Sequence, residues 1–171
     1  MNRITTEKAP ALVVLDLDWT TWRGDCDRNF RAPFHTFNGR VFDAWFHEVK
    51  LFPDVREILA AFAAAGTKIA FASRNPSTAD CEALLRAFGL FDMACVFLAH
   101  SSGGTDNKDP HFATIKERTG IEYSDMVFFD DGPGNIAGAS ALGVKSVLCQ
   151  YPHGLTWAHV EQCYDLQGNT T

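Results

Sequence analysis

The stretch Ala11-Leu12-Val13-Val14-Leu15-Asp16-Leu17-Asp18-Trp19-Thr20 determines the fold that we expect of this chain. Its apolar beginning leads directly into two carboxylates and a threonine hydroxyl. A short apolar run that ends in polar residues is typical of a strand buried on both faces. In parallel α/β sheets, the residues just past the carboxyl end of a strand line the ligand crevice. We therefore expect Asp16, Asp18 and Thr20 to converge where this strand opens into a loop.

Composition limits the class of protein. The chain has 171 residues, of which 46% are hydrophobic and 21% charged, and its formal net charge is −6. These values suit one soluble domain over residues 1–171 and argue against a partner with a phosphate backbone, such as nucleic acid. No apolar run is long enough to span a membrane, and the first ten residues lack the apolar core of a signal peptide. Five scattered cysteines, without a C-x-x-C pair, suit free thiols in the cytoplasm.

After the first strand, regular elements alternate along the chain. We expect four further strands, over 68–72, 95–98, 126–129 and 144–148, and five helices, over 54–65, 77–88, 109–119, 135–142 and 155–163. Strands that alternate with single helices form right-handed βαβ units and a parallel sheet covered on both faces. The fold prediction is therefore a three-layer α/β domain with a five-stranded parallel sheet, preceded by a loose lead-in over residues 1–10.

The segment 21–52 is the least regular part of the chain. It mixes aromatic and basic side chains without a sustained helical period, and Asn38-Gly39 predicts a hairpin turn. A long irregular segment in a compact domain is usually functional or disordered. Its aromatic content favours a packed flap inserted after the first strand.

Polar side chains also follow the later strands. Ser73 and Arg74 follow the second strand, Lys108 lies beyond the third, and Asp130 and Asp131 follow the fourth. Each has an ordinary alternative, such as a helix cap, a surface lysine or a solvated loop. Their common placement at strand ends outweighs these alternatives, because carboxylates from separate loops suit Mg²⁺ and an ammonium with hydroxyls suits a phosphoryl group.

These motifs resemble those of the haloacid dehalogenase superfamily: D-x-D-x-T, a Ser/Thr after the second strand, a lysine, and an acidic pair after the fourth strand. Within it, the chain is similar to the magnesium-dependent phosphatase-1 subfamily. The similarity spans about residues 11–150 and includes Asp16–Trp22, Pro33-Phe34-His35, Leu51-Phe52-Pro53, Ala72-Ser73-Arg74 and Met126–Asp131. It implies a Rossmann-like core with a minimal flap and no large cap domain.

The resemblance also implies roles for the first two motifs. Asp16 would be the nucleophile that forms an aspartyl-phosphate, and it would also ligate the metal. Asp18 would be the general acid and then the general base, while its backbone carbonyl ligates Mg²⁺. Thr20 and Ser73 would hydrogen-bond the phosphoryl oxygens.

The remaining residues would complete the site. By the same resemblance, Lys108 neutralises charge between nucleophile and phosphate, Asp130 and Asp131 hold the metal directly and through water, and Asn135 supports the acidic pair. Arg74 is a separate hypothesis: beside Ser73 at the mouth, it could hold a distal group of the substrate.

The function implied is that of a Mg²⁺-dependent phosphomonoesterase. Its partner would be a small sugar phosphate or a phosphotyrosyl protein, with no nucleic-acid or membrane partner, and the protein would be a monomer or a homodimer. Two alternatives stay open: a glyceryl transferase of the same superfamily that loads an acyl carrier protein, and a receiver-like signalling domain that stores phospho-aspartate.

Overall fold

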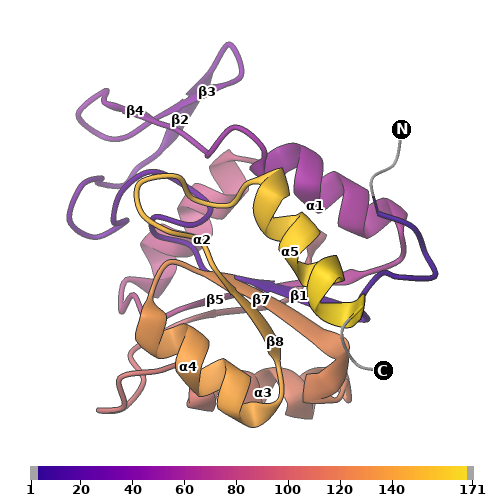
Figure 1. Cartoon of the computed structure of the whole chain (residues 1–171). Coiled ribbons are helices and arrows are strands. Elements are labelled where there is room, and N and C mark those ends of the chain that lie inside the picture. Colours follow the sequence, from indigo (N-terminus) through magenta and orange to yellow (C-terminus); the bar gives the residue numbers. More distant parts are fainter. Residues whose placement is uncertain (1–3, 169–171) are drawn as a thin grey trace.

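A five-stranded parallel sheet forms the centre of the computed structural model, which describes residues 4–168 (Figure 1). The strand order is β6-β5-β1-β7-β8. The strands are β1 (Leu12–Leu15), β5 (Lys68–Ser73), β6 (Ala94–Ala99), β7 (Met126–Asp130) and β8 (Lys145–Leu148). This confirms the predicted α/β class and the five-stranded parallel sheet.

Strand β1 lies at the centre of the sheet, and all four of its residues are buried. Its last residue, Leu15, pairs with Phe71 of β5 and with Phe129 of β7. The two neighbouring strands continue past this level, to Ser73 and Asp130 respectively. Three chain segments therefore leave the sheet side by side at its carboxyl edge.

Helices cover both faces of the sheet. They are α1 (Val55–Ala64), α2 (Thr78–Ala87), α3 (Asp109–Thr119), α4 (Pro133–Leu142) and α5 (Trp157–Gly168), with short 3-10 turns over Phe91–Met93 and Tyr123–Asp125. Alternate residues of β1 face opposite layers: Val13 and Leu15 join the cluster with α1, α2 and α5, whereas Leu12 and Val14 join the cluster with α3 and α4. None of the helices in the described chain is both long and apolar enough to cross a membrane.

Asp54 occupies the N-cap position of α1. The Asp54 side chain makes no cap hydrogen bond to its own helix. Its Oδ2 instead accepts a hydrogen bond from the backbone N–H of Trp157, at 3.1 Å. The carboxylate thus joins the starts of α1 and α5, a tertiary contact that local sequence does not reveal.

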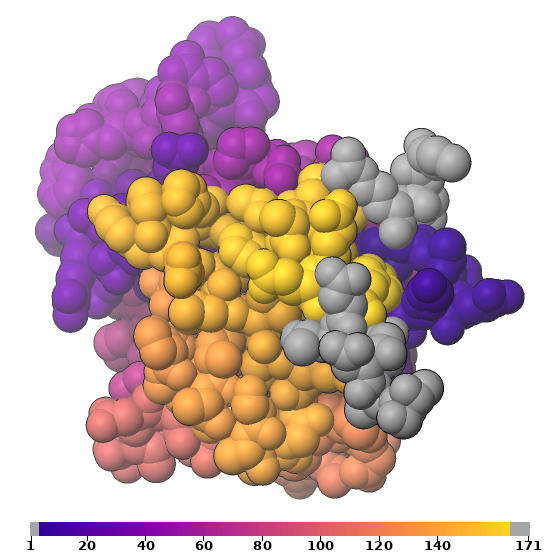
Figure 2. Space-filling model, in the orientation of Figure 1, coloured from indigo at the N-terminus to yellow at the C-terminus, as the bar shows by residue number. Residues whose placement is uncertain are grey.

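The segment inserted after β1 contains a small antiparallel sheet of β2 (His35–Phe37), β3 (Arg40–Phe42) and β4 (Glu48–Val49). Asn38 and Gly39, with φ of 49° and 74°, form the turn between β2 and β3, as the hairpin prediction requires. The sheet projects from one corner of the molecule (Figures 1 and 2).

The aromatic residues of this insertion are only partly packed. Trp22 and Phe52 are buried, but Phe37, Trp45 and Phe46 are 68%, 56% and 76% exposed. The expectation of a packed flap is therefore wrong for these three side chains. The projecting sheet has three strands of two or three residues each, and it is too small to enclose these side chains by itself.

Candidate active site

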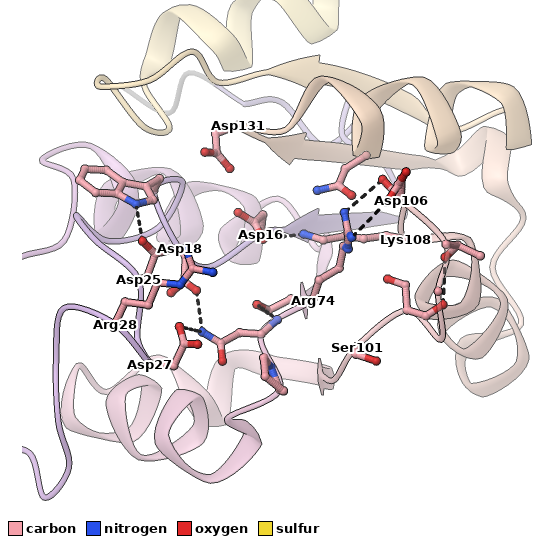
Figure 3. A pocket seen from close by; sticks show the side chains of 18 residues that line it. Asp16, Asp18, Asp25, Asp27, Arg28, Arg74, Ser101, Asp106, Lys108 and Asp131 are labelled. Atoms are coloured by element: carbon pink, nitrogen blue, oxygen red, sulfur yellow. Dashed lines mark hydrogen bonds and ion pairs between the residues drawn. The ribbon is translucent and has the colours of Figure 1, made fainter.

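A cavity of about 550 Å³ opens at the carboxyl edge of the sheet (Figure 3). Asp16, Asp18 and Ser73 line it, together with Lys108 and Asp131. Ser73 is the last residue of β5, and the others come from the segments after β1, β6 and β7. The structure therefore brings together the strand ends that the sequence analysis singled out.

Lys108 connects the acidic groups. Its side chain is only 1% exposed. Its Nζ lies 2.5 Å from Asp16 Oδ1 and 2.5 Å from Asp130 Oδ2, and it donates to the carbonyl oxygen of Ala72 at 2.7 Å. An ammonium has three donors, and all three are used here. Lys108 is therefore fixed in place beside Asp16.

Asp16 is nearly buried, and both of its carboxylate oxygens have partners. Oδ1 contacts Lys108, and Oδ2 accepts a hydrogen bond from the hydroxyl of Thr20 at 3.0 Å. Burial and the nearby charge of Asp130 raise the pKa of Asp16 well above its usual value, while Lys108 opposes the shift. Thr20 itself is fully buried and does not line the cavity, so its contact is with Asp16.

The two residues of the acidic pair, Asp130 and Asp131, lie in different environments. Asp130 is fully buried, and it accepts hydrogen bonds from the backbone N–H of Gly132 (2.7 Å) and from the Asn135 amide (3.0 and 3.2 Å). Asp131 lines the cavity. Burial, followed by the charge of Asp130, raises the pKa of Asp131 to about 6. Asp130 therefore anchors Lys108 and Asn135, whereas Asp131 faces the open site.

The donor set fits a hard divalent cation. Asp16, Asp130 and Asp131 can each offer a carboxylate oxygen, and these oxygens lie within 4.8 Å of one another. The Lys108 ammonium alone leaves this carboxylate group with excess negative charge, which is one reason the pKa values of Asp16 and Asp131 are raised. Asn135 Oδ1 is buried without a hydrogen-bond partner in the described structure. A group of oxygen ligands with excess negative charge suits Mg²⁺.

Asp18 lies across the cavity from Lys108 (Figure 3). Its Oδ1 accepts hydrogen bonds from the Trp22 indole (2.8 Å) and from the backbone N–H of Cys26 (2.9 Å). Its Oδ2 accepts one from the Asn75 amide (2.8 Å). Burial raises the pKa of Asp18, and these donors oppose the shift. The carboxyl group is thus held in one orientation at the cavity wall.

Ser73 and Arg74 are adjacent residues that both line the cavity. Ser73 is 2% exposed, and its Oγ accepts a hydrogen bond from the backbone N–H of Asn75 at 3.1 Å. The Arg74 guanidinium donates to the carbonyl oxygen of Asp106 at 3.1 Å. Arg74 therefore bridges the loops that follow β5 and β6, and its side chain also lines the cavity.

Sequence reasoning missed one wall of the cavity. Asp25, Asp27, Arg28 and Asn75 line it opposite the loop that contains Ser101. The first three belong to the inserted segment, where nothing in the local pattern distinguishes them from surface charges. Asn75 directly follows the Ser73-Arg74 pair, and this adjacency was the one signal that could have identified it.

Similar sequences occur among known proteins. The sequence pattern of the Acid Phosphatase family matches residues 8–166. Human "Magnesium-dependent phosphatase 1" is 35% identical over 144 residues, which is 84% of this chain and 80% of the human protein. A HAD-like hydrolase superfamily protein of Schizosaccharomyces pombe is 29% identical over 134 residues, 74% of this chain and 78% of that protein.

Solved structures share the fold. An uncharacterized protein from Listeria monocytogenes superposes with a TM-score of 0.65 at 21% identity, over 85% of this chain and 82% of that one. The N-terminal part of a Bacteroides fragilis protein, containing a phosphatase domain complexed with Mg, gives 0.68 at 21% identity, over 91% of this chain and 40% of that one. On the match across residues 8–166 and the similarity to the human phosphatase, the chain belongs to the acid phosphatase family of the haloacid dehalogenase superfamily.

Proposed function

We propose that this protein is a Mg²⁺-dependent phosphomonoesterase that acts through an aspartyl-phosphate on Asp16. The observation that carries the proposal is the buried Asp16–Lys108–Asp130 arrangement, with Asp131 beside it at the cavity. A structural salt bridge alone would not require a fifth charged group, Asp18, across the same cavity. The magnesium dependence of the human relative, given in its name, supports the choice of ion.

In the first step, a carboxylate oxygen of Asp16 forms a bond to phosphorus while the bond from phosphorus to the ester oxygen breaks. The leaving oxygen takes a proton from Asp18. In the second step, Asp18 removes a proton from water, whose oxygen attacks phosphorus and releases inorganic phosphate and the Asp16 carboxylate. One group thus serves as acid and then as base, as its place across the cavity from Asp16 allows.

The surrounding residues stabilise charge. Phosphoryl transfer is catalysed mainly by positioning and electrostatic stabilisation. Lys108 holds a positive charge beside Asp16, Thr20 orients the Oδ2 of Asp16, and Ser73 offers a hydroxyl proton in the cavity. Mg²⁺, held by carboxylate oxygens of Asp16 and the acidic pair Asp130/Asp131, would supply the remaining positive charge to the transferring phosphoryl group. The family resemblance adds the backbone carbonyl of Asp18 to these ligands.

The cavity supports a small hydrophilic substrate. Its volume of about 550 Å³ lies in the range of small-molecule sites, and most of its lining side chains are polar or charged. We therefore infer that a phosphorylated sugar fits better than a bulky phosphotyrosyl protein. Arg74 and Arg28 at the walls would hold the part of the substrate beyond the phosphate.

A phosphatase assay over a panel of phosphorylated metabolites tests the proposal. We expect turnover that requires Mg²⁺, is lost on chelation, and falls by at least about a thousandfold in Asp16→Asn. Acid quenching during turnover should trap phosphate on Asp16 of the wild-type protein, as mass spectrometry of peptides would show. An Asp16→Asn protein that hydrolyses the same esters at the wild-type rate would refute the mechanism.

The alternatives predict different results. A receiver-like domain would retain its phospho-aspartate without turnover, and a glyceryl transferase would release little phosphate from generic esters. The acidic pair lies at the end of β7, the fourth strand of the main sheet in chain order. In a receiver-like domain the pair would follow the first strand, so this placement disfavours that alternative. Cytoplasmic location and the choice between monomer and homodimer stay predictions.

A further inference from the structure

Asn75 links three parts of the site through one amide group. Its Nδ2 donates to Asp18 Oδ2 at 2.8 Å and to Asp27 Oδ1 at 3.0 Å. Its Oδ1 accepts a hydrogen bond from the backbone N–H of Ser77 at 2.9 Å, next to the start of α2. The residue is 8% exposed and lines the cavity. Every hydrogen of the amide is therefore used.

The direction of these bonds is determined by the network. The Ser77 N–H can only donate, so the atom that faces it must be the amide oxygen. The NH₂ group then faces the two carboxylates. A flipped amide would place its oxygen against Asp18 and Asp27 and leave all three acceptors without a proton between them. Asn75 is thus a donor to Asp18.

The contacts of Asp18 show which of its oxygens can exchange a proton. Each carboxylate oxygen has about two lone pairs. Among the described residues, Oδ1 accepts hydrogen bonds from Trp22 and Cys26, whereas Oδ2 accepts one from Asn75 alone. Oδ2 therefore retains the free lone pair, and Asn75 is the group that fixes where this lone pair lies.

We propose that Asn75 is a positioning residue that aims Asp18 Oδ2 at the leaving oxygen of the substrate and couples it, through Asp27, to the inserted segment. This inference rests on the proposed function of Asp18 as acid and base. Asn75 acts through Asp18 and needs no contact with the substrate. The same amide ties Asp27, next to Arg28 on the cavity wall, to the proton-transfer group.

The leaving group of the substrate separates this role from a merely structural one. An alkyl phosphate needs a proton on its departing oxygen, whereas p-nitrophenyl phosphate releases a stable anion and needs little help. The value of kcat/KM reports the steps up to departure of the leaving group. Asn75→Ala should therefore lower kcat/KM about tenfold to a hundredfold for an alkyl phosphate, and much less for the nitrophenyl ester.

Two further variants exclude helix capping as the cause. Asn75→Asp keeps an oxygen for the Ser77 N–H but removes both donors, so it should show at least the loss of Asn75→Ala on the alkyl ester. Asn29→Ala is the matched control, because its amide oxygen accepts from the backbone N–H of Asp25 in the same segment without contacting Asp18. We expect Asn29→Ala to change both esters equally and slightly.

A double variant tests whether Asn75 acts through Asp18. In an Asp18→Asn background, Asn75→Ala should cause no additional loss on the alkyl phosphate. The inference would be overturned by equal losses of Asn75→Ala on the two esters or by wild-type activity of Asn75→Asp. It would also be overturned if Asn75→Ala caused its full loss again in the Asp18→Asn background. The proposed function fails separately: it fails if the wild-type protein shows no Mg²⁺-dependent hydrolysis of either ester, or if Asp16→Asn matches it.

Discussion

Replacing Lys108 by Met tests the electrostatic core of the site. Methionine keeps an unbranched apolar side chain of nearly the same length. It removes a charge that lies 2.5 Å from each of two carboxylate oxygens, on a side chain that is 1% exposed. At an effective dielectric constant of about 20, each such pair attracts with about 7 kcal/mol. This gross value overstates the loss, because the variant also avoids the cost of burying the ammonium, and the carboxylates can take up a proton.

Proton uptake sets the magnitude. Without the lysine, the buried group must bind one more proton than it does in the wild-type protein, and a carboxylate whose ordinary pKa is 3.8 takes this proton up from the solvent. At 1.36 kcal/mol per pH unit, this costs about 4 kcal/mol at pH 7 and about 2 kcal/mol at pH 5. Breaking buried ion pairs typically costs about 3–5 kcal/mol, which agrees with the value at pH 7.

The sign of the pH dependence follows from the raised pKa. Burial and Asp130 already hold the pKa of Asp16 well above its usual value, and loss of Lys108 raises it further. A carboxyl with a higher pKa in the folded state binds protons more tightly there than in the unfolded chain. Stability therefore increases as the pH falls through the folded pKa, and the deficit of Lys108→Met shrinks toward pH 5.

Urea unfolding of the metal-free protein, followed by circular dichroism at both pH values, measures this directly. Lys116→Met is a suitable control, since Lys116 pairs with Glu122 at the surface and its loss should leave the unfolding midpoint unchanged. If Lys108→Met unfolds within about 1 kcal/mol of wild type at pH 7, or if its deficit grows as the pH falls, the charge coupling described here is wrong.

Three further predictions concern stability. Burial lowers the pKa of His111 from 6.5 to about 4, so the free energy of unfolding should fall as the pH drops from 6.5 toward 4. His111→Gln should flatten that part of a profile of melting temperature against pH, and an unchanged slope would contradict this. Phe62→Ala, at a side chain 1% exposed, should lower the free energy of unfolding by about 3–5 kcal/mol with KM unchanged in the phosphatase assay, and a loss below about 1 kcal/mol would mean that the site is not tightly packed. Gly154→Ala would place a Cβ 2.1 Å from a ring atom of Phe52 at a φ of 62°, and should lower the free energy of urea unfolding by about 2–4 kcal/mol. Gly39→Ala is the control: its φ is 74° with open space around it, and it should cost about 1 kcal/mol. Equal costs would refute the steric argument.

The main sheet could be predicted because its signals are local. The apolar runs that end at Asp16 and at Asp130 each indicate a buried strand from their own residues. The alternation of strands with helices then allows few topologies. The hairpin at Asn38-Gly39 was equally readable, since its turn requires positive φ at both positions. Local patterns did not predict the orientation of the small sheet or the exposure of Phe37 and Phe46, because both depend on how the sheet packs on the rest of the chain.

The sequence by itself determined that acids, a hydroxyl and a lysine would meet at one edge of a parallel sheet, because strand direction alone brings such ends together. Only the tertiary structure decided how they share their contacts. Lys108 is held between Asp16 and Asp130, and Asn75 joins Asp18 to the inserted segment. These pairings connect residues 22 to 92 positions apart, across loops whose paths are set by packing rather than by any local pattern.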